Sequence, residues 1–400
     1  MKSWFIWVGI GFLFCLVILI WQFNIPPPTK VIQNVETVAT ISADSTYDEC
    51  DPSVGGNVGP LIPSQTSTII PTITPFPLDL SKIKKIPESD LTRRAGFGIS
   101  SPTDPQYWAA LLGSNWYLDW TVHAKSSTDL PIHWKMIRVH AGCISPSLAE
   151  VRSEVANSPG QVWIIGNEPD VIWQDNVPAA RYSQAYHDLY QVIKTTDPSA
   201  LVAIAGVSQA TPLRLKYLDQ VLLDYRNQFG GLMPVDWWTV HAYTLREERN
   251  SWGVDIPPGM DETHGELYEV EDHARLDLFQ NQLIVFRRWM AAKGYQNKPL
   301  AVTEFGILMP ADYGFPPELV ADYLEATFSW LYKAKDEAIG YPGDAFRLVQ
   351  KWAWFSLSDP IYSDANLGDL SNGELTPLGK RFRTILEQGI GDQPFPGGCP

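Results

Sequence analysis

The sequence predicts a (β/α)8 barrel, an α/β fold, preceded by a single transmembrane helix and a disordered linker. Three observations carry this prediction. A long uncharged apolar run lies near the N-terminus, a stretch rich in Pro, Ser and Thr follows it, and the remainder alternates short apolar runs with amphipathic stretches. We expect an anchor at 1–23, a linker at 24–91, a catalytic barrel at 92–390 and a tail at 391–400.

The first segment reads as a signal anchor. Residues 4–23 carry no charge, and a helix of that length spans the roughly 30 Å hydrocarbon core of a bilayer. Lys2 precedes the run and no further basic residue follows until Lys30, so the positive-inside rule places the rest of the chain outside the cytoplasm. A cleaved signal peptide is the alternative, although the run lacks a small-residue cleavage site. The barrel is thus expected to be extracytoplasmic, either membrane-anchored or secreted.

The linker and the overall composition narrow the function class. Residues 24–91 are too rich in Pro, Ser and Thr to bury a core, and their prolines favour extended conformations. The formal net charge of −15 argues against a basic face that grips nucleic acid or anionic lipid. The chain holds 16 Trp, and flat aromatic rings stack on sugars, which weakly favours a carbohydrate partner.

The barrel prediction rests on alternating apolar strands and helices. Such alternation indicates a parallel sheet covered by helices, and eight units in this length fit a (β/α)8 barrel. The predicted strands are 96–100, 116–120, 135–140, 162–166, 201–207, 236–241, 300–305 and 352–357. Helices are expected, among others, at 179–196, 274–293 and 317–335. A doubly wound open sheet is the alternative, but no glycine-rich nucleotide motif follows the first strand.

Two glutamates lie at strand ends, where barrels place their catalytic groups. Glu168 follows the fourth predicted strand and Glu304 ends the seventh. A buried carboxylate costs several kcal/mol unless it is paired, so two of them at one barrel mouth are expensive for structure alone. The alternative is that each caps a helix or pairs with a basic residue. Two carboxylates across one site are what glycoside cleavage needs, one protonated and one ionised.

Four segments resemble a known group of enzymes. GNEPD (166–170), DWWTVHAY (236–243), AVTEFG (301–306) and WAWFS (352–356) are similar to segments of the clan A retaining glycoside hydrolases. Within that clan, they resemble the "glycosyl hydrolase catalytic core" family, which includes endo-β-1,3-glucanases. The resemblance implies that Glu168 is the general acid/base and Glu304 the nucleophile. It also implies that Asn167 hydrogen-bonds the sugar 2-hydroxyl.

The same resemblance suggests supporting residues around the two glutamates. His241 and Tyr243 share one face of their strand, and the clan has a His or Tyr there that hydrogen-bonds a catalytic carboxylate; a core histidine is the alternative. Arg138 is a charge inside an apolar strand, and we expect Glu304 as its anionic partner. Clan members place this arginine on the second strand, whereas here it lies on the third, which leaves its role open.

Three tryptophans are candidates for contact with the sugar. Trp354 is at the position where the clan has the floor of a sugar subsite, with simple barrel packing as the alternative. Trp116 and Trp120 belong to a Trp-Tyr-x-x-Trp segment similar to one in the glucanase-like family, and we expect them to be stacking platforms.

The sequence therefore predicts a membrane-anchored, extracytoplasmic retaining O-glycosyl hydrolase acting on a polysaccharide or oligosaccharide, with β-glucan as the first candidate. A transglycosylase would use the same two glutamates, whereas a noncatalytic glycan-binding or cell-wall scaffold protein would need neither. A metal-dependent hydrolase would need clustered ligands, and His140 and His241 are isolated in the sequence. We expect no cofactor, no metal and no nucleic-acid partner.

Overall fold

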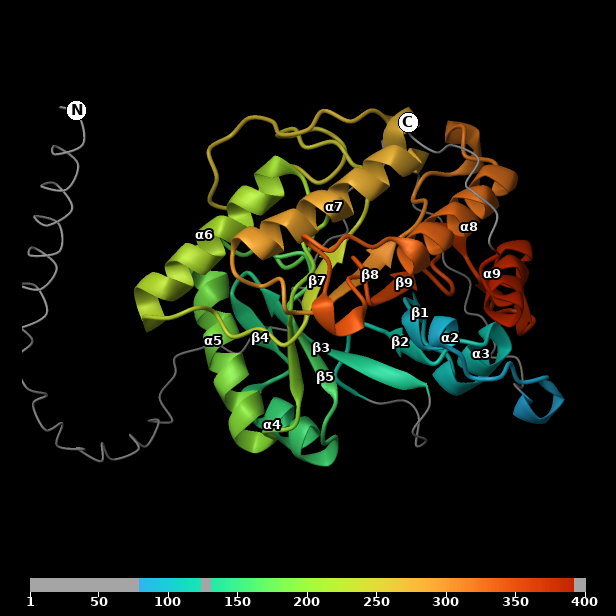
Figure 1. Cartoon of the computed structure of the whole chain (residues 1–400), viewed down its shortest axis with the longest axis horizontal. Coiled ribbons are helices and arrows are strands. Elements are labelled where there is room, and N and C mark those ends of the chain that lie inside the picture. Colours follow the sequence, from blue (N-terminus) through green and yellow to red (C-terminus); the bar gives the residue numbers. More distant parts are fainter. Residues whose placement is uncertain (1–78, 124–130, 392–400) are drawn as a thin grey trace, which may run out of the picture. The chain divides into compact units, whose positions relative to one another are not determined.

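The structure is a computed structural model that describes residues 79–123 and 131–391 (Figure 1). The chain divides into two units, Met1–Thr46 and Tyr47–Pro400, and every described residue belongs to the second. The predicted anchor, most of the predicted linker and nearly all of the tail lie outside the described residues. Within the described ranges, no helix is both long and apolar enough to span a bilayer.

Eight parallel strands form a nearly closed barrel, which confirms the predicted (β/α)8 barrel and its eight predicted strands. They are β1 (Ala95–Gly98), β2 (Trp116–Leu118), β3 (Ile132–His140), β5 (Val162–Ile165), β6 (Leu201–Ile204), β7 (Trp238–His241), β8 (Leu300–Phe305) and β9 (Lys351–Trp354). Their hydrogen-bonded order is β6-β5-β3-β2-β1-β9-β8-β7. A parallel bridge between Ala203 of β6 and Trp237, just before β7, joins the two ends of this order.

Helices follow most of the strands and surround the sheet (Figure 1). After the short α2 (Asp90–Arg94) come α3 (Pro105–Leu112), α4 (Leu148–Asn157), α5 (Ala179–Thr196), α6 (Pro212–Phe229), α7 (Leu276–Ala292), α8 (Pro317–Lys333) and α9 (Pro377–Gln388). The three helices named from the sequence are α5, α7 and α8. The described residues between β2 and β3 contain no helix, so the alternation is interrupted once there.

Two small features were not predicted from the sequence. Strand β4 (Cys143–Ser145) folds back antiparallel onto the end of β3, and β10 (Gly368–Asp369) pairs with β11 (Glu374–Leu375). Short 3-10 turns are η1 (Leu80–Lys82), η2 (Val270–Ala274), η3 (Ala311–Tyr313), η4 (Pro342–Asp344) and η5 (Ser363–Ala365).

Part of the range predicted as linker packs on the barrel. Ile83 and Ile86 pack against the larger of the two hydrophobic clusters of buried residues, here called the outer core. The Arg383 guanidinium in α9 donates to the Lys84 carbonyl at 2.6 Å. Helix α2 begins with a capping box in which Ser89 and Thr92 bond each other's backbone N–H groups. The described folded unit therefore includes residues 79–91 as well as the predicted barrel.

Indole rings fill the interior of the barrel. Trp134 lies 5.0 Å from both Trp116 and Trp237, measured between ring centroids, and small and aliphatic residues of neighbouring strands pack around them. Trp116 is fully buried and donates its Nε1–H to the Arg94 carbonyl at 2.9 Å. The prediction of Trp116 as a sugar platform is therefore wrong, because neither face of its ring is open. Most tryptophans in the described part of the chain are buried or partly buried and belong to the core.

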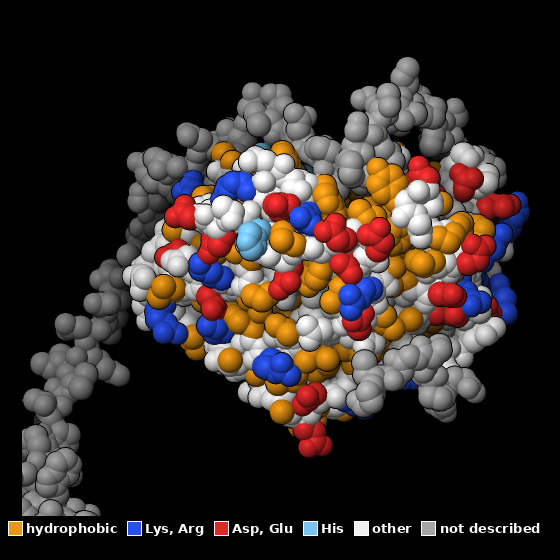
Figure 2. Space-filling view, turned by 90° about the horizontal axis from the view of Figure 1, so that it is seen from above, with side chains coloured by type: hydrophobic (Ala, Val, Ile, Leu, Met, Phe, Trp, Pro, Cys, Tyr) orange, Lys and Arg blue, Asp and Glu red, His pale blue; other side chains and the backbone are white. Residues whose placement is uncertain are grey.

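Charges on the surface are mixed. On the face seen in Figure 2, Lys and Arg side chains are interspersed with Asp and Glu and do not gather into a basic patch. This distribution agrees with the formal net charge of −15.

Candidate active site

Glu168 lies in a tight turn directly after β5. Its backbone adopts a left-handed conformation, with φ of 44°, which costs about 1 kcal/mol or more for a residue with a side chain. The turn is held by Asp175, whose Oδ2 accepts from the backbone N–H groups of Asn167 at 2.6 Å and Val139 at 3.0 Å. The Glu168 N–H in turn donates to the Gly206 carbonyl at 3.1 Å. The Glu168 residue is 8% exposed.

Glu304 lies near the end of β8, next to two register shifts. The pairing of β8 slips against β7 before His241 and against β9 before Phe305. Such irregularities re-aim side chains at barrel rims. Oε1 of Glu304 accepts from the Trp120 indole at 2.7 Å, and Oε2 accepts from the Tyr243 hydroxyl at 3.2 Å. Glu304 is 7% exposed.

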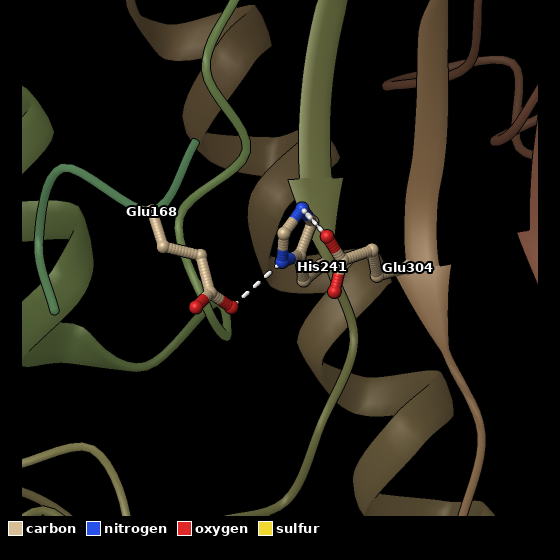
Figure 3. Close-up of side chains that lie close together, drawn as sticks. All are labelled: Glu168, His241 and Glu304. Atoms are coloured by element: carbon tan, nitrogen blue, oxygen red, sulfur yellow. Dashed lines mark hydrogen bonds and ion pairs between the residues drawn. The ribbon is translucent and has the colours of Figure 1, made fainter. Parts of the chain in front are cut away.

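His241, at the end of β7, lies between the two glutamates (Figure 3). Its Nδ1 is 2.7 Å from Oε1 of Glu168, and its Nε2 is 3.6 Å from Oε1 of Glu304. One ligand atom of each of the three residues lies within 4.8 Å of the others. Gly206 packs against the imidazole so closely that a Cβ there would lie 2.6 Å from the ring Cδ2. The site thus joins two carboxylates through one buried ring.

Among the described residues, this trio is also the one group of His, Cys, Asp or Glu side chains close enough to hold a metal ion. A bound ion would have to replace existing contacts, because Nδ1 of His241 pairs with Glu168 and both oxygens of Glu304 accept hydrogen bonds. The donor set of one imidazole and two carboxylates is chemically suited to a divalent cation.

The surroundings raise the pKa of both carboxyl groups, but unequally. Burial, reinforced by the Asp170 charge, raises the pKa of Glu168 to about 8, against the opposing effect of Arg214 and Arg138. Burial also raises the pKa of Glu304, to about 7, and the nearby Glu168 adds to this effect. His241 and the hydrogen bonds from Trp120 and Tyr243 act in the opposite direction and limit the rise.

Burial lowers the pKa of His241, so its ring is neutral near pH 7. A protonated Glu168 can then donate to Nδ1, which leaves the Nε2–H directed at Glu304. With this tautomer of His241 the proton lies on Glu168 and the negative charge on Glu304, which are the charge states that an acid and a nucleophile require.

Arg138 does not pair with Glu304, so that prediction is wrong. Its Nε donates to Oδ1 of the fully buried Asp175 at 2.7 Å, and a guanidinium Nη2 donates to Gln174 at 3.3 Å. The arginine lies near the end of β3, where the nearest buried carboxylate belongs to the turn after β5. It acts on the turn that carries Glu168.

Trp354 is also placed differently from the prediction. It is fully buried in the outer core, edge-on to Phe305 with 5.4 Å between ring centroids, and its Nε1–H donates to the Ala365 carbonyl. Barrel packing, the alternative left open from the sequence, describes it. Ala353 belongs to the interior cluster, so strand alternation directs Phe355 inward, and its ring lies edge-on to Trp120 at 5.6 Å.

Asn167 and Trp120 lie at the site, but their predicted sugar contacts stay predictions. The Asn167 amide nitrogen is 3.4 Å from Gln174, and its buried Oδ1 has no hydrogen-bond partner among the described residues. Trp120 is half-buried, and its bond to Glu304 was not anticipated.

Sequence reasoning missed four buried charged residues next to the site. Asp170 belongs to the quoted GNEPD segment, and the argument that a carboxylate after an apolar strand needs a partner applied to it equally. Asp175, Arg214 and Glu247 lie in a loop, a helix and a loop, where no periodic pattern marks a charge as buried.

Comparison with known proteins shows likeness in structure only. No protein-family model and no curated protein sequence matches the chain. A GH128 (subgroup II) endo-β-1,3-glucanase from Pseudomonas viridiflava matches with a TM-score of 0.50 at 18% identity, covering 73% of this chain and 97% of that one. A GH128 (subgroup III) curdlan-specific exo-β-1,3-glucanase from Blastomyces gilchristii matches with a TM-score of 0.50 at 16% identity, covering 74% and 100%. The expected resemblance to endo-β-1,3-glucanase-like barrels is thus confirmed at the level of the fold.

Proposed function

We propose that this chain is a retaining glycoside hydrolase that cleaves β-1,3-glucan, with Glu168 as general acid/base and Glu304 as nucleophile. The observation that carries the proposal is the pair of buried glutamates joined by His241 at the ends of β5 and β8. Their unequal surroundings support opposite roles, since Glu304 accepts hydrogen bonds from Trp120 and Tyr243, which stabilise its negative charge.

The reaction would proceed in two displacements. Glu304 attacks the anomeric carbon while Glu168 protonates the departing glycosidic oxygen, so a glycosyl ester forms as the glycosidic bond breaks. Glu304 is then neutral, and the loss of a like charge lowers the pKa of Glu168. Ionised Glu168 takes a proton from water, whose oxygen attacks the anomeric carbon and releases Glu304.

The spacing of the carboxylates supports retention over inversion. Retaining enzymes hold their two carboxyl groups about 5–5.5 Å apart, and inverting enzymes about 6.5–9.5 Å apart to admit a water. Here one oxygen of each glutamate lies within 4.8 Å of the other, which is closer to the first range.

The choice of β-1,3-glucan as substrate rests on the fold likeness together with the sequence segments. The Pseudomonas and Blastomyces barrels are named as β-1,3-glucanases, and both contain the architecture found here. We place the activity outside the cytoplasm, tethered by residues 1–23, on the charge asymmetry around the apolar run alone. Protease accessibility of the barrel in intact cells tests that location.

The function is tested with the full chain in detergent. Reducing-sugar release is measured on laminarin beside β-1,4- and mixed-linkage glucans, xylan and mannan. Glu304→Gln should lose at least about 10³-fold in kcat, whereas Glu318→Gln, an exposed glutamate at the start of α8, should not. Activity of the Glu304 variant equal to wild type would refute the assignment, and inactivity of the wild type on every glycan would refute the function.

Two further readouts separate the mechanisms. Azide should rescue Glu168→Ala on an activated aryl β-glycoside and give a β-glycosyl azide, because the ester on Glu304 still forms. Chelation with EDTA should leave the rate unchanged; a loss that zinc or magnesium restores would instead favour a metal at Glu168, His241 and Glu304.

A further inference from the structure

A buried ion cluster lies beside the turn of Glu168. Arg214 of α6 places its Nε 3.1 Å from Oδ2 of Asp170 and 3.3 Å from Oε1 of Glu247. All three side chains are fully buried, with no exposed side-chain surface. The mechanism proposed above uses none of the three.

The cluster ties together three loops at the C-terminal ends of neighbouring strands. Asp170 belongs to the loop after β5 and accepts from the N–H and hydroxyl of Ser208, in the loop after β6. Glu247, in the loop after β7, accepts from the Thr211 hydroxyl at 2.6 Å and from the backbone N–H of Glu266 at 2.8 Å. Arg214 is thus the centre on which these loops converge.

Arg214 also holds the far part of the long loop 242–275. Its Nη2 donates to the carbonyls of Val254 at 2.9 Å and Asp255 at 2.7 Å. The Glu168 carbonyl accepts from Val171 at 3.1 Å, so Asp170 lies inside the turn that Glu168 begins. Displacement of Asp170 would therefore displace Glu168.

We propose that Arg214, with Asp170 and Glu247, is a positioning centre that sets the orientation of Glu168 as the general acid and links it to the loop 242–275. Burying three ions is a poor way to gain stability, because apolar side chains of similar volume pack as well without the desolvation cost. The arrangement gives directional control that apolar packing does not, since Asp170, Glu247 and Arg214 each form hydrogen bonds with a segment of the chain other than their own.

The charge of the cluster also acts on Glu168. Two carboxylates and one guanidinium leave one net negative charge, and Asp170 is, after burial, the largest cause of the raised pKa of Glu168. The titratable and charged groups that act on or adjoin Glu168 are Arg138 of β3, Asp170 and Asp175 after β5, Arg214 of α6, His241 and Tyr243 at the end of β7, Glu304 of β8 and Tyr362 before η5.

This inference rests on the proposed function. It is tested by comparing substrates whose leaving groups differ in their need for protonation. Cleavage of laminarin expels a sugar hydroxyl and needs the acid, whereas a 2,4-dinitrophenyl β-laminarioligoside expels a phenolate that needs none. We expect Asp170→Asn and Arg214→Met to lower kcat/KM for glycosylation on laminarin by roughly 30-fold or more and on the aryl substrate by less than about threefold. In Asp170→Asn the basic limb of the laminarin pH profile should move down by roughly one unit, since a charge that raises the pKa of Glu168 is gone.

Arg287→Met is the matched control. Arg287 is equally buried, but it donates to the carbonyls of Leu348 and Lys298, which precede β9 and β8, at the opposite end of the barrel. This variant should lose stability and show equal, small losses on both substrates with an unchanged pH profile.

The outcomes distinguish a positioning role from a purely structural one. Equal losses on both substrates in Asp170→Asn, with an unmoved basic limb, would overturn the positioning role. If Arg214→Met fails to fold, Asp170→Asn and Glu247→Gln decide, because both keep the shape of the side chain they replace. A wild-type chain that cleaves neither substrate would reject the proposed function itself.

Discussion

The indole Nε1 of Trp120 donates to Oε1 of Glu304 at 2.7 Å. Trp120 lies just after β2, where the clan that the sequence resembles has an arginine on the second strand. Here the carboxylate accepts from two neutral donors, Trp120 and Tyr243, and has no arginine partner among the described residues. A neutral donor stabilises a negative charge less than a guanidinium does, which is consistent with a pKa of about 7 for Glu304.

Removing the Trp120 N–H should shift the acidic limb of the pH profile of kcat/KM to higher pH. Trp120→Phe keeps an aromatic ring beside Phe355 but loses the N–H, whose hydrogen bond lowers the pKa of Glu304. Because the nucleophile must be ionised, the acidic limb of the kcat/KM profile should move up by roughly one unit. Trp116→Phe is the control: its indole bonds Arg94 inside the barrel, so stability should fall and the limb should stay. An unmoved limb in Trp120→Phe would count against this role.

Gly206 should be intolerant of a single methyl group. In Gly206→Ala the new Cβ would lie 2.6 Å from Cδ2 and 2.8 Å from Nε2 of His241, so the imidazole must shift. Misplacement of a catalytic contact by about 1 Å can cost 10²-fold, and we expect a fall in kcat of about that size. Gly231→Ala, where a Cβ meets nothing within 4 Å, should be neutral. Similar kinetics for the two variants would show that the ring position is not critical.

The site should make the fold less stable as pH rises. The pKa values of Glu168 and Glu304 are raised to about 8 and about 7, so the folded chain holds protons that the unfolded chain releases near pH 4.5. Stability is then greatest below pH 4.5 with respect to these groups and declines as pH rises through 7 and 8.

Glu168→Gln cannot ionise and should therefore be more stable than wild type at pH 9, by roughly 1–3 kcal/mol, with little difference at pH 4.5. Denaturant unfolding at the two pH values measures this. The exposed Glu337→Gln should show the same small change at both. A Glu168 variant no more stable than wild type at pH 9 would contradict the raised pKa.

The strands and the two glutamates at their ends were predictable because both depend on local order in the sequence. Continuous apolar runs mark parallel strands buried on both faces, and a polar residue directly after such a run falls at the barrel mouth. This reasoning located β5 and β8 and, with them, Glu168 and Glu304.

The errors arose where position depends on the register of strands or on distant partners. Trp354 was predicted at the sugar subsite, although Ala353 belongs to the interior cluster and strand alternation therefore directs Trp354 outward. The register shifts in β8 have no sequence signature that distinguishes which residue they turn inward. The partners of buried charges, such as Asp175 for Arg138, come from loops whose path the sequence pattern does not determine.

The pairing of Arg138 with Asp175 can be tested by the pH dependence of kcat/KM. If Arg138 acts on the turn of Glu168, its loss affects the basic limb, and if it paired with Glu304, its loss would affect the acidic limb. Arg138 lowers the pKa of Glu168 by its charge and holds the turn through Asp175. Arg138→Leu should therefore move the basic limb to higher pH, because the acid keeps its proton longer, and should leave the acidic limb in place.

The same variant should lose roughly 1–3 kcal/mol of stability, because Asp175 is left buried with only backbone donors from Asn167 and Val139. Arg138→Lys, which keeps the charge but not the fork of donors, should restore the basic limb more fully than the stability. If Arg138 paired with Glu304 instead, its loss would raise the pKa of the nucleophile and move the acidic limb upward. The pH dependence of kcat/KM on laminarin for the two variants distinguishes these placements without a further structure.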